Sequence, residues 1–113
     1  MLDPTSSQLD RYLTLVSARQ RLVSSNVANA DTPGYKTKDL DFESELRNSV
    51  SSTPNITEVS GLKIKNDGNN VDLDREARLM AENDLRFTVA SNLLHSNLKQ
   101  LRMAIEGGSS SSS

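Results

Sequence analysis

The sequence predicts a mainly α-helical chain. Two long helices are expected to form an antiparallel, coiled-coil-like hairpin around a short irregular middle segment that holds one small β-hairpin. Two observations predict this fold: apolar residues recur with heptad spacing before residue 30 and after residue 72, and residues 24–36, between them, are rich in turn formers. The predicted segments are an N-terminal helix and turn motif (1–36), an irregular middle (37–70), a C-terminal helix (71–107) and a flexible Ser-rich tail or linker (108–113).

The first helix is expected to begin near Pro4 and to end at about residue 29. Either Asp3 caps it with Pro4 at the first helical position, or Thr5 caps it in a capping box with Gln8. An ordinary bundle helix and a helix that also contacts neighbouring chains fit the pattern equally well. Its apolar residues form a seam (Leu9, Leu13, Val16, Val23, Val27 and Ala30, with Gln20 as the polar member) and a second stripe (Tyr12, Leu15 and Leu22).

The chain must turn directly after this helix. Pro33 fixes its own φ and moves Thr32 out of the helical region, while Gly34 supplies the positive φ of a type II turn. Tyr35 is well placed to anchor the turn against the helix, and two asparagines are expected to satisfy backbone groups at the helix end. The predicted turn motif comprises Asn26, Asn29, Thr32, Pro33, Gly34 and Tyr35.

The middle segment has weaker patterning. Residues 39–46 alternate acidic with apolar side chains, which fits either an extended segment or a short helical turn around residues 42–48. Their four carboxylates either contact a neighbouring subunit or are solvated in a loop, and the loop is favoured. Residues 49–60 are expected to form a loop. Residues 62–65 alternate like a half-buried strand, residues 66–69 form a hairpin-turn signal, and the partner strand is expected to begin at Val71 and Leu73.

The second helix is expected to start near Asp72 or Asp74, run to Glu106 and stop at residues 107–108. Apolar residues become denser toward its end, so the part from Phe87 onward is expected to make the firmest contact. Asp84, on the seam, needs a polar partner or an exit to water. The predicted seam is Leu73, Ala77, Met80, Asp84, Phe87, Ser91, Leu94, Leu98, Leu101 and Ile105.

The composition argues against catalysis, metal binding and nucleic-acid binding. The chain has no cysteine, so a disulfide or a thiolate metal site is excluded, and its net charge of −2 comes from interleaved acids and bases, which disfavours nucleic-acid binding. His95 is the only histidine and has no partner at metal-ligand spacing. We therefore expect no enzyme, catalytic residue, metal, cofactor or small-molecule substrate. The sequence shows neither a cleaved signal peptide nor a membrane-spanning stretch, which by itself indicates a cytoplasmic protein.

One motif resembles a known family. Asn-Val-Ala-Asn at residues 26–29, followed by Asp-Thr-Pro-Gly-Tyr-Lys at 31–36, is similar to the N-terminal signature of bacterial flagellar basal-body rod and hook proteins, an Ala-Asn-x-x-Thr-x-Gly-aromatic-Lys run at the end of the first helix. Residues 37–46 and the Met-Ala-Glu-Asn-Asp-Leu-Arg run at 80–86 look most like the proximal rod members. The short middle segment agrees, because relatives farther out in the rod and hook often carry a larger β-rich domain there.

The resemblance implies a structural subunit of the proximal rod, which the flagellar type III system exports without a cleaved signal and which assembles through its terminal helices into the periplasmic, torque-transmitting axial tube. Implied partners are other rod proteins, the adaptor that joins rod to membrane ring, the export gate and further copies of the chain. An outer stripe (Tyr12, Leu15, Leu22, Val89, Ala90 and Leu93) is expected to be left over for neighbouring chains. The expected assembly interface comprises Leu9, Leu13, Leu15, Val16, Leu22, Val23, Phe87, Val89, Leu94, Leu98 and Leu101.

A small helical export chaperone or adaptor that is never incorporated is the alternative. Such a protein is expected to be a folded cytoplasmic monomer or dimer, whereas a rod subunit is expected to be largely disordered when dilute.

Overall fold

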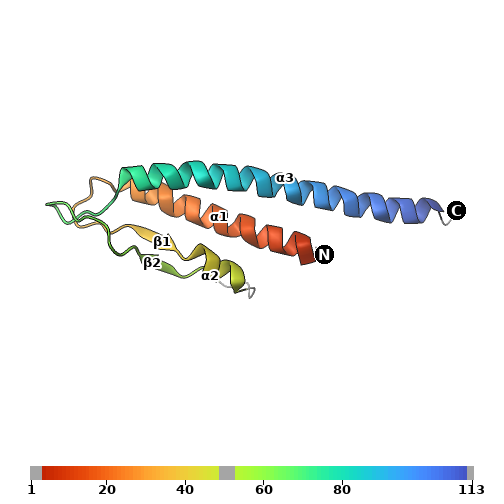
Figure 1. Ribbon diagram of the computed structural model, residues 1–113, viewed down its shortest axis with the longest axis horizontal. Helices are drawn as coiled ribbons and strands as arrows, with labels where there is room; N and C mark the ends of the chain where they lie inside the picture. Colours follow the sequence, from red (N-terminus) through yellow and green to blue (C-terminus); the bar gives the residue numbers. More distant parts are fainter. Residues whose placement is uncertain (1–3, 49–52, 112–113) are drawn as a thin grey trace.

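The computed structural model is an elongated two-helix hairpin with a short sheet-and-helix layer along one side (Figure 1). It describes residues 4–48 and 53–111, with side chains for residues 4–48 and 53–107. The chain extends over 74 × 25 × 17 Å, and both long helices follow the long axis. The mainly α-helical class is confirmed. The elements are α1 (Pro4–Ala28), β1 (Lys38–Leu40), α2 (Phe42–Arg47), β2 (Ile56–Glu58) and α3 (Leu73–Ser111).

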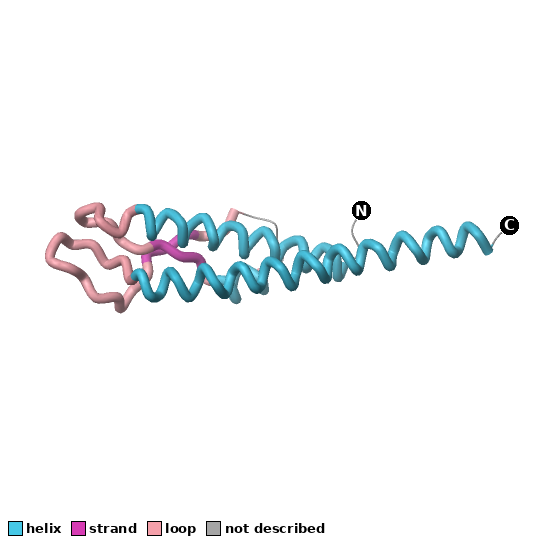
Figure 2. The backbone as a smooth tube through the Cα atoms, turned by 90° about the horizontal axis from the view of Figure 1, so that it is seen from above, coloured by secondary structure: helices cyan, strands magenta, loops and turns pink. Residues whose placement is uncertain are grey.

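Two side-chain pairs fix the register of α1 against α3. The Asn97 amide donates a hydrogen bond to the Ser6 hydroxyl, and the Asn83 amide donates one to Gln20 Oε1 at 3.2 Å. The pairs are two heptads apart in both helices, as expected for an antiparallel coiled-coil packing. Because α1 has 25 residues and α3 has 39, the end of α3 projects past the start of α1 (Figure 2). We call residues 98–107 the α3 overhang.

The α3 seam differs from the predicted one. The buried α3 residues are Glu76, Asn83 and Ala90, and each lies one position before a predicted seam residue. Glu76 and Asn83 hydrogen-bond to Asn26 and Gln20 of α1, and Ala90 is small enough to be buried beside them, so apolar periodicity does not mark this line. Asp84 is accordingly exposed, which is the expected exit to water.

The C-terminal part of α3 is not the firmest contact, so that expectation is wrong. Phe87 is 45% exposed and Ile105 is 68% exposed. The reason is geometric: α1 begins near the level of Asn97, so beyond this point no described part of the chain lies beside α3 (Figure 2).

The main apolar core lies between α1 and the layer formed by β1 and α2. The rings of Tyr12 and Phe42 meet edge to face with centroids 5.2 Å apart. The middle segment thereby covers the second stripe of α1, so the expectation that Leu15 lies on an uncovered outer stripe is wrong: its side chain is fully buried. The core contains Leu15, Val16, Ala18, Leu40 and Phe42, with Tyr12 and Leu22 packed against them.

A small antiparallel sheet is present, but not where the sequence predicted it. β1 pairs with β2, which lies inside the predicted loop 49–60 and has only exposed residues, so no alternation marks it. The turn predicted at residues 66–69 does form, since Gly68 N donates to Lys65 O at 2.9 Å and Lys65 N to Asn69 O at 2.8 Å. Residues 62–65 and 71–73 form no strands, because the backbone after the turn bonds to another loop instead.

Residues 39–46 adopt both predicted alternatives in succession, an extended strand and then a helix. Asp41 separates them: its carboxylate caps α2 by accepting a hydrogen bond from Ser44 N at 3.2 Å. A one-residue cap between strand and helix explains why no single periodicity dominates this segment.

The helix ends agree with the prediction in part. Thr5 lies inside α1, so the start at Thr5 is wrong, and the alternative cap Asp3 lies outside the described residues. Asp72 caps α3, because its Oδ1 accepts hydrogen bonds from Asp74 N at 3.0 Å and from Arg75 N at 3.3 Å. At its other end α3 runs through residues 107–108 to Ser111, because glycine inside a helix costs only about 1 kcal/mol and the serines that follow offer no apolar capping contact. The flexible tail (108–113), partly outside the described residues, stays a prediction.

Candidate functional site

The turn after α1 has the geometry of the predicted type II turn. Tyr35 N donates to Thr32 O at 3.2 Å, and Gly34 has a φ of 76°. Asn29 supports the helix end, as its side-chain amide donates to Ser25 O at 2.8 Å. The turn therefore directs the chain from the end of α1 into β1.

Asn26 is the centre of the hydrogen bonding at this end. Its side chain is fully buried. Its Nδ2 donates to Lys38 O at 2.9 Å and to Glu76 Oε1 at 2.6 Å. Its Oδ1 accepts from the Tyr35 hydroxyl at 2.9 Å and from Lys38 N at 3.1 Å. These bonds use the full capacity of a carboxamide, so one side chain joins α1, the turn, β1 and α3.

A neutral cluster of charges surrounds this carboxamide. Arg19 binds Asp39 with two bonds, Nε to Oδ1 at 3.1 Å and Nη2 to Oδ2 at 3.0 Å. Arg75 bridges the two carboxylates, with Nη2 at 2.6 Å from Asp39 Oδ2 and Nη1 at 2.6 Å from Glu76 Oε2. Two cations balance two anions, which allows Glu76 to be fully buried.

The pairing also shifts the pKa of Arg75. Burial lowers the pKa of its guanidinium, but the hydrogen bonds and charges of Glu76 and Asp39 outweigh burial and raise the pKa above its ordinary value. A raised pKa in the folded state stabilises the fold at every pH below the ordinary arginine pKa and loses this effect only above it. Arg75 therefore stays charged and paired throughout the physiological pH range.

The acidic residues of the middle segment are not simply solvated, contrary to the favoured expectation. Asp39 is buried against two arginines, and Glu45 accepts from Arg11 at 3.4 Å and from Asn55 N at 2.9 Å. Asp41 is the α2 cap, and only Glu43 is an exposed residue outside these contacts. The sequence does not predict the contacts of Asp39, because both of its arginine partners lie on the long helices, at least 20 positions away.

A second loop closes over the turn. The Asn69 amide donates to Asn29 O at 2.8 Å and to Thr32 O at 2.9 Å. Gly34 N donates to Asp67 O at 2.9 Å, and the backbones approach so closely that a Cβ on Gly68 would lie 3.3 Å from Gly34 Cα. Hydrogen bonds and a close backbone approach thus join the two loops. Nearby, Thr37 N donates to Asn70 Oδ1 at 2.6 Å. We call the following hydrogen-bonded residues the polar junction: Arg19, Asn26, Tyr35, Thr37, Asp39, Asn69, Asn70, Arg75 and Glu76.

Sequence reasoning found Asn26 and Tyr35 but missed the residues that meet them. The sequence pattern places Asn69 in a hairpin turn at residues 66–69, gives Asn70 no role, and makes Glu76 one of the acidic residues in the first turn of the second helix. One signal was available for α3: polar Glu76, Asn83 and Asn97 are spaced by multiples of seven, which places them on one line of a helix. No local signal joins Asn69 to the turn at Gly34.

The expected assembly residues fall into three groups. Those in the first group are buried inside the chain: Leu15, Val16 and Val23. Those in the second are half-buried: Leu9, Leu13, Leu22, Leu94 and Leu101. Those in the third are exposed: Phe87, Val89 and Leu98. Their role in assembly stays a prediction.

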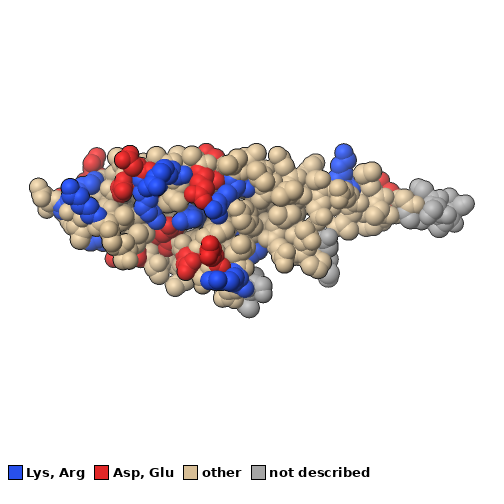
Figure 3. Space-filling model, viewed as in Figure 1, with Lys and Arg blue, Asp and Glu red and all other residues tan. Residues whose placement is uncertain are grey.

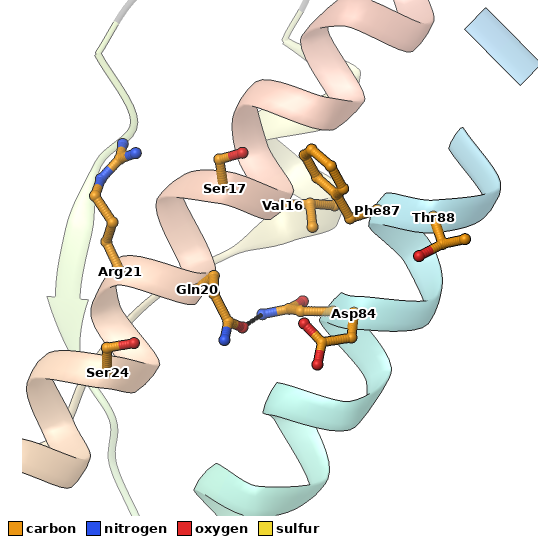
Figure 4. Close-up of a pocket in the computed structure, with 9 residues that line it drawn as sticks. Val16, Ser17, Gln20, Arg21, Ser24, Asp84, Phe87 and Thr88 are labelled. Atoms are coloured by element: carbon orange, nitrogen blue, oxygen red, sulfur yellow. Dashed lines mark hydrogen bonds between the residues drawn. The ribbon is translucent and has the colours of Figure 1, made fainter. Parts of the chain in front are cut away.

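Open grooves flank the contact of α1 with α3. Figure 4 shows one of them, in which Val16 and Phe87 lie between the helices and Arg21 and Asp84 lie near the rims. The groove on the other side is almost wholly apolar. It is lined by Leu9, Tyr12, Leu85, Arg86, Val89, Ala90 and Leu93, and we call it the apolar groove.

Charge is segregated along the molecule. In the view of Figure 3 most charged side chains lie over the loop half, and the half toward the C-terminus carries few. Residues 87–98 contain no charged residue at all. The loop end thus has the polar junction and the charges, and the other end has the exposed apolar residues.

The described part of the chain contains neither a metal-binding cluster nor a membrane-spanning helix. Its acidic residues and its histidine form no group of three suited to a metal ion. None of its helices combines the length and the apolar character needed to cross a membrane.

Asn26→Asp is expected to destabilise the fold by about 3 kcal/mol near neutral pH, because a carboxylate oxygen replaces Nδ2 beside the Glu76 carboxylate and the Lys38 carbonyl. These neighbours raise the pKa of the new carboxyl group in the folded state, so the loss should shrink as the pH falls and the group regains a donor proton. Urea unfolding followed by circular dichroism, in an osmolyte that favours the folded state, measures this. Asn92→Asp adds the same charge at an exposed position and should change little; equal losses would contradict the central role of Asn26.

Gly68→Ala is expected to destabilise the fold by about 3 kcal/mol, since the new Cβ meets a positive φ and the Gly34 backbone. Gly61 is the matched control: its φ is 82°, close to the 86° of Gly68, but a Cβ there meets nothing within 4 Å. Gly61→Ala should therefore cost only the conformational strain, about 1 kcal/mol. The same unfolding measurement compares them, and equal losses would show that the close approach of the loops is unimportant.

Several known proteins are similar to this chain in sequence. A family described as flagella basal body rod protein matches residues 13–36, which include the end of α1 and the turn. The flagellar basal body rod protein FlgB of Salmonella typhimurium (strain LT2) is 31% identical over 96% of this chain and 99% of the relative. FlgB of Escherichia coli (strain K12) is 29% identical with the same coverage, and FlgB of Borrelia hermsii is 28% identical over 85% of this chain and 91% of the relative.

The likenesses to the Salmonella and Escherichia coli proteins extend over 96% of the chain. The chain belongs to the FlgB family of flagellar basal body rod proteins.

Proposed function

We propose that the chain is a structural subunit of the proximal rod, exported by the flagellar type III system without a cleaved signal and built through its terminal helices into the axial tube that transmits torque. The single observation that carries the proposal is the exposed apolar surface of α3 from Leu85 onward, on a chain whose relatives are basal body rod proteins. Such a surface favours contacts with neighbouring chains, because each large apolar side chain that becomes buried contributes about 2 kcal/mol.

The polar junction supports a mechanical role. It joins the two helices at the loop end through paired charges and saturated hydrogen bonds, which have strict geometry. An apolar contact tolerates sliding, whereas a bidentate arginine–carboxylate pair does not. The hairpin can therefore pass a twisting force from one helix to the other at this end, while the open end binds its neighbours.

The proposed partners are the other proximal rod proteins, the adaptor that joins the rod to the membrane ring, the export gate and further copies of this chain. The chain contains no cysteine, so no disulfide has to be broken before export in an unfolded state. Assembly then supplies the apolar burial that the open end of the hairpin lacks on its own.

A single cysteine at Val89 is expected to form oxidative cross-links to neighbouring chains in purified basal bodies, since Val89 is exposed on α3. Leu15→Cys is the matched control, because Leu15 is fully buried in the chain's own core and should form none. Gel electrophoresis and immunoblotting of the particles read out both variants.

The same particles distinguish a built-in subunit from an export chaperone. A chaperone or adaptor would be missing from the basal bodies and would cross-link only in the cytoplasm. That outcome would overturn the proposed function, whereas links from Val89→Cys to rod proteins would support it.

A further inference from the structure

The α3 overhang carries an apolar line that the described chain leaves open. Leu98, Leu101 and Ile105 follow the helical spacing i, i+3, i+7, so they share one face. Leu98 and Ile105 are exposed, to 39% and 68%, and Leu101 is half-buried, where α3 projects past the start of α1. The overhang therefore presents an apolar line of a spacing that suits packing against a second helix.

The apolar groove has the complementary character. Leu85 and Leu93, on its α3 wall, are 66% and 54% exposed, and Leu9 and Tyr12 form its α1 wall. Its one charged lining residue is already occupied, because Arg86 pairs with Glu82 at 2.5 Å and lies 5.3 Å above the Phe42 ring. A helix that enters this groove meets apolar side chains and no unpaired charge.

We propose that the α3 overhang of one copy docks into the apolar groove of the next copy of this chain. The inference rests on the proposed function and names the partner of its assembly surface. Both surfaces span about two helical turns, at residues 85–93 and 98–105. Both present apolar residues at ridge spacing, so they can interdigitate. The charged residues of the overhang are Lys99, Arg102 and Glu106, and none of them belongs to its apolar line.

The proposal fixes how copies are arranged. Leu93 and Ile105 lie 12 positions apart on α3, which corresponds to a rise of about 18 Å. In a parallel arrangement the next copy is therefore displaced by about this distance along the helix axis. Donor and acceptor are different surfaces, so the contact is heterologous and repeats without closing into a dimer.

Two single-cysteine variants, Leu93→Cys and Ile105→Cys, test the contact in cells that express both. A disulfide requires Cα atoms within about 7 Å, so these positions cannot link within one helix and a 93–105 bond reports two copies. Basal bodies are purified, oxidised and analysed by peptide mass spectrometry. A double variant with Gln20→Cys and Asn83→Cys, whose native side chains are 3.2 Å apart, controls for oxidation within one chain.

We expect the mixed 93–105 link in particles from the co-expressing cells and no dimer in particles with either variant alone. Particles that contain the chain without the mixed link, or with 93–93 links, would overturn the docking arrangement and leave the proposed function standing. Absence of the chain from the particles would refute the proposed function and this inference together. The abundance of the chain in the particles therefore distinguishes the two failures.

Discussion

The carboxamide of Asn26 is the interaction on which the rest of the structure depends. It is fully buried, and its four hydrogen bonds reach the turn, both backbone groups of Lys38, and Glu76 on α3. An unmade hydrogen bond in a buried site costs more than a made one contributes, so the partners must all be in place together. This requirement sets where α1 ends, where β1 begins and how α3 faces α1. The ion pairs of Asp39 with Arg19 and Arg75 join the middle segment to both long helices in the same way.

The two ends of the hairpin are held by different forces. At the loop end, polar groups with strict geometry determine one arrangement, and the helices meet there through Glu76 and Asn83. At the open end, Leu85, Leu93 and Ile105 are exposed and have no such constraint within the described chain. Apolar contacts are non-directional, which suits an end that we propose accepts neighbouring chains, whereas the polar junction determines the geometry of the loop end.

Local and periodic patterns predicted much of this fold, while long-range polar pairing escaped them. Heptad spacing predicted both long helices, and the Pro33-Gly34 pair predicted the turn. The residues whose role was missed are those with a partner far away in the sequence. The sequence predicts Asn69 as a turn residue, but its side chain also bonds to Asn29. It predicts Asp39 as an acidic loop residue, but its carboxylate binds Arg75. The same limit displaced the small sheet, because β2 pairs through its backbone and shows no apolar alternation. Exposed Val89 and buried Leu15 were indistinguishable by pattern, since coverage by α2 is a tertiary effect.

Hydrogen–deuterium exchange of the purified chain, in an osmolyte that favours the folded state, tests most directly the claim that the polar junction organises the molecule. The account predicts the slowest exchange at amides that donate to side chains of the junction, namely those of Thr37, Lys38 and Val71, and the fastest exchange along the α3 overhang. Slower exchange along the overhang than in the junction would contradict the account, because the apolar end would then stabilise the monomer without the polar junction.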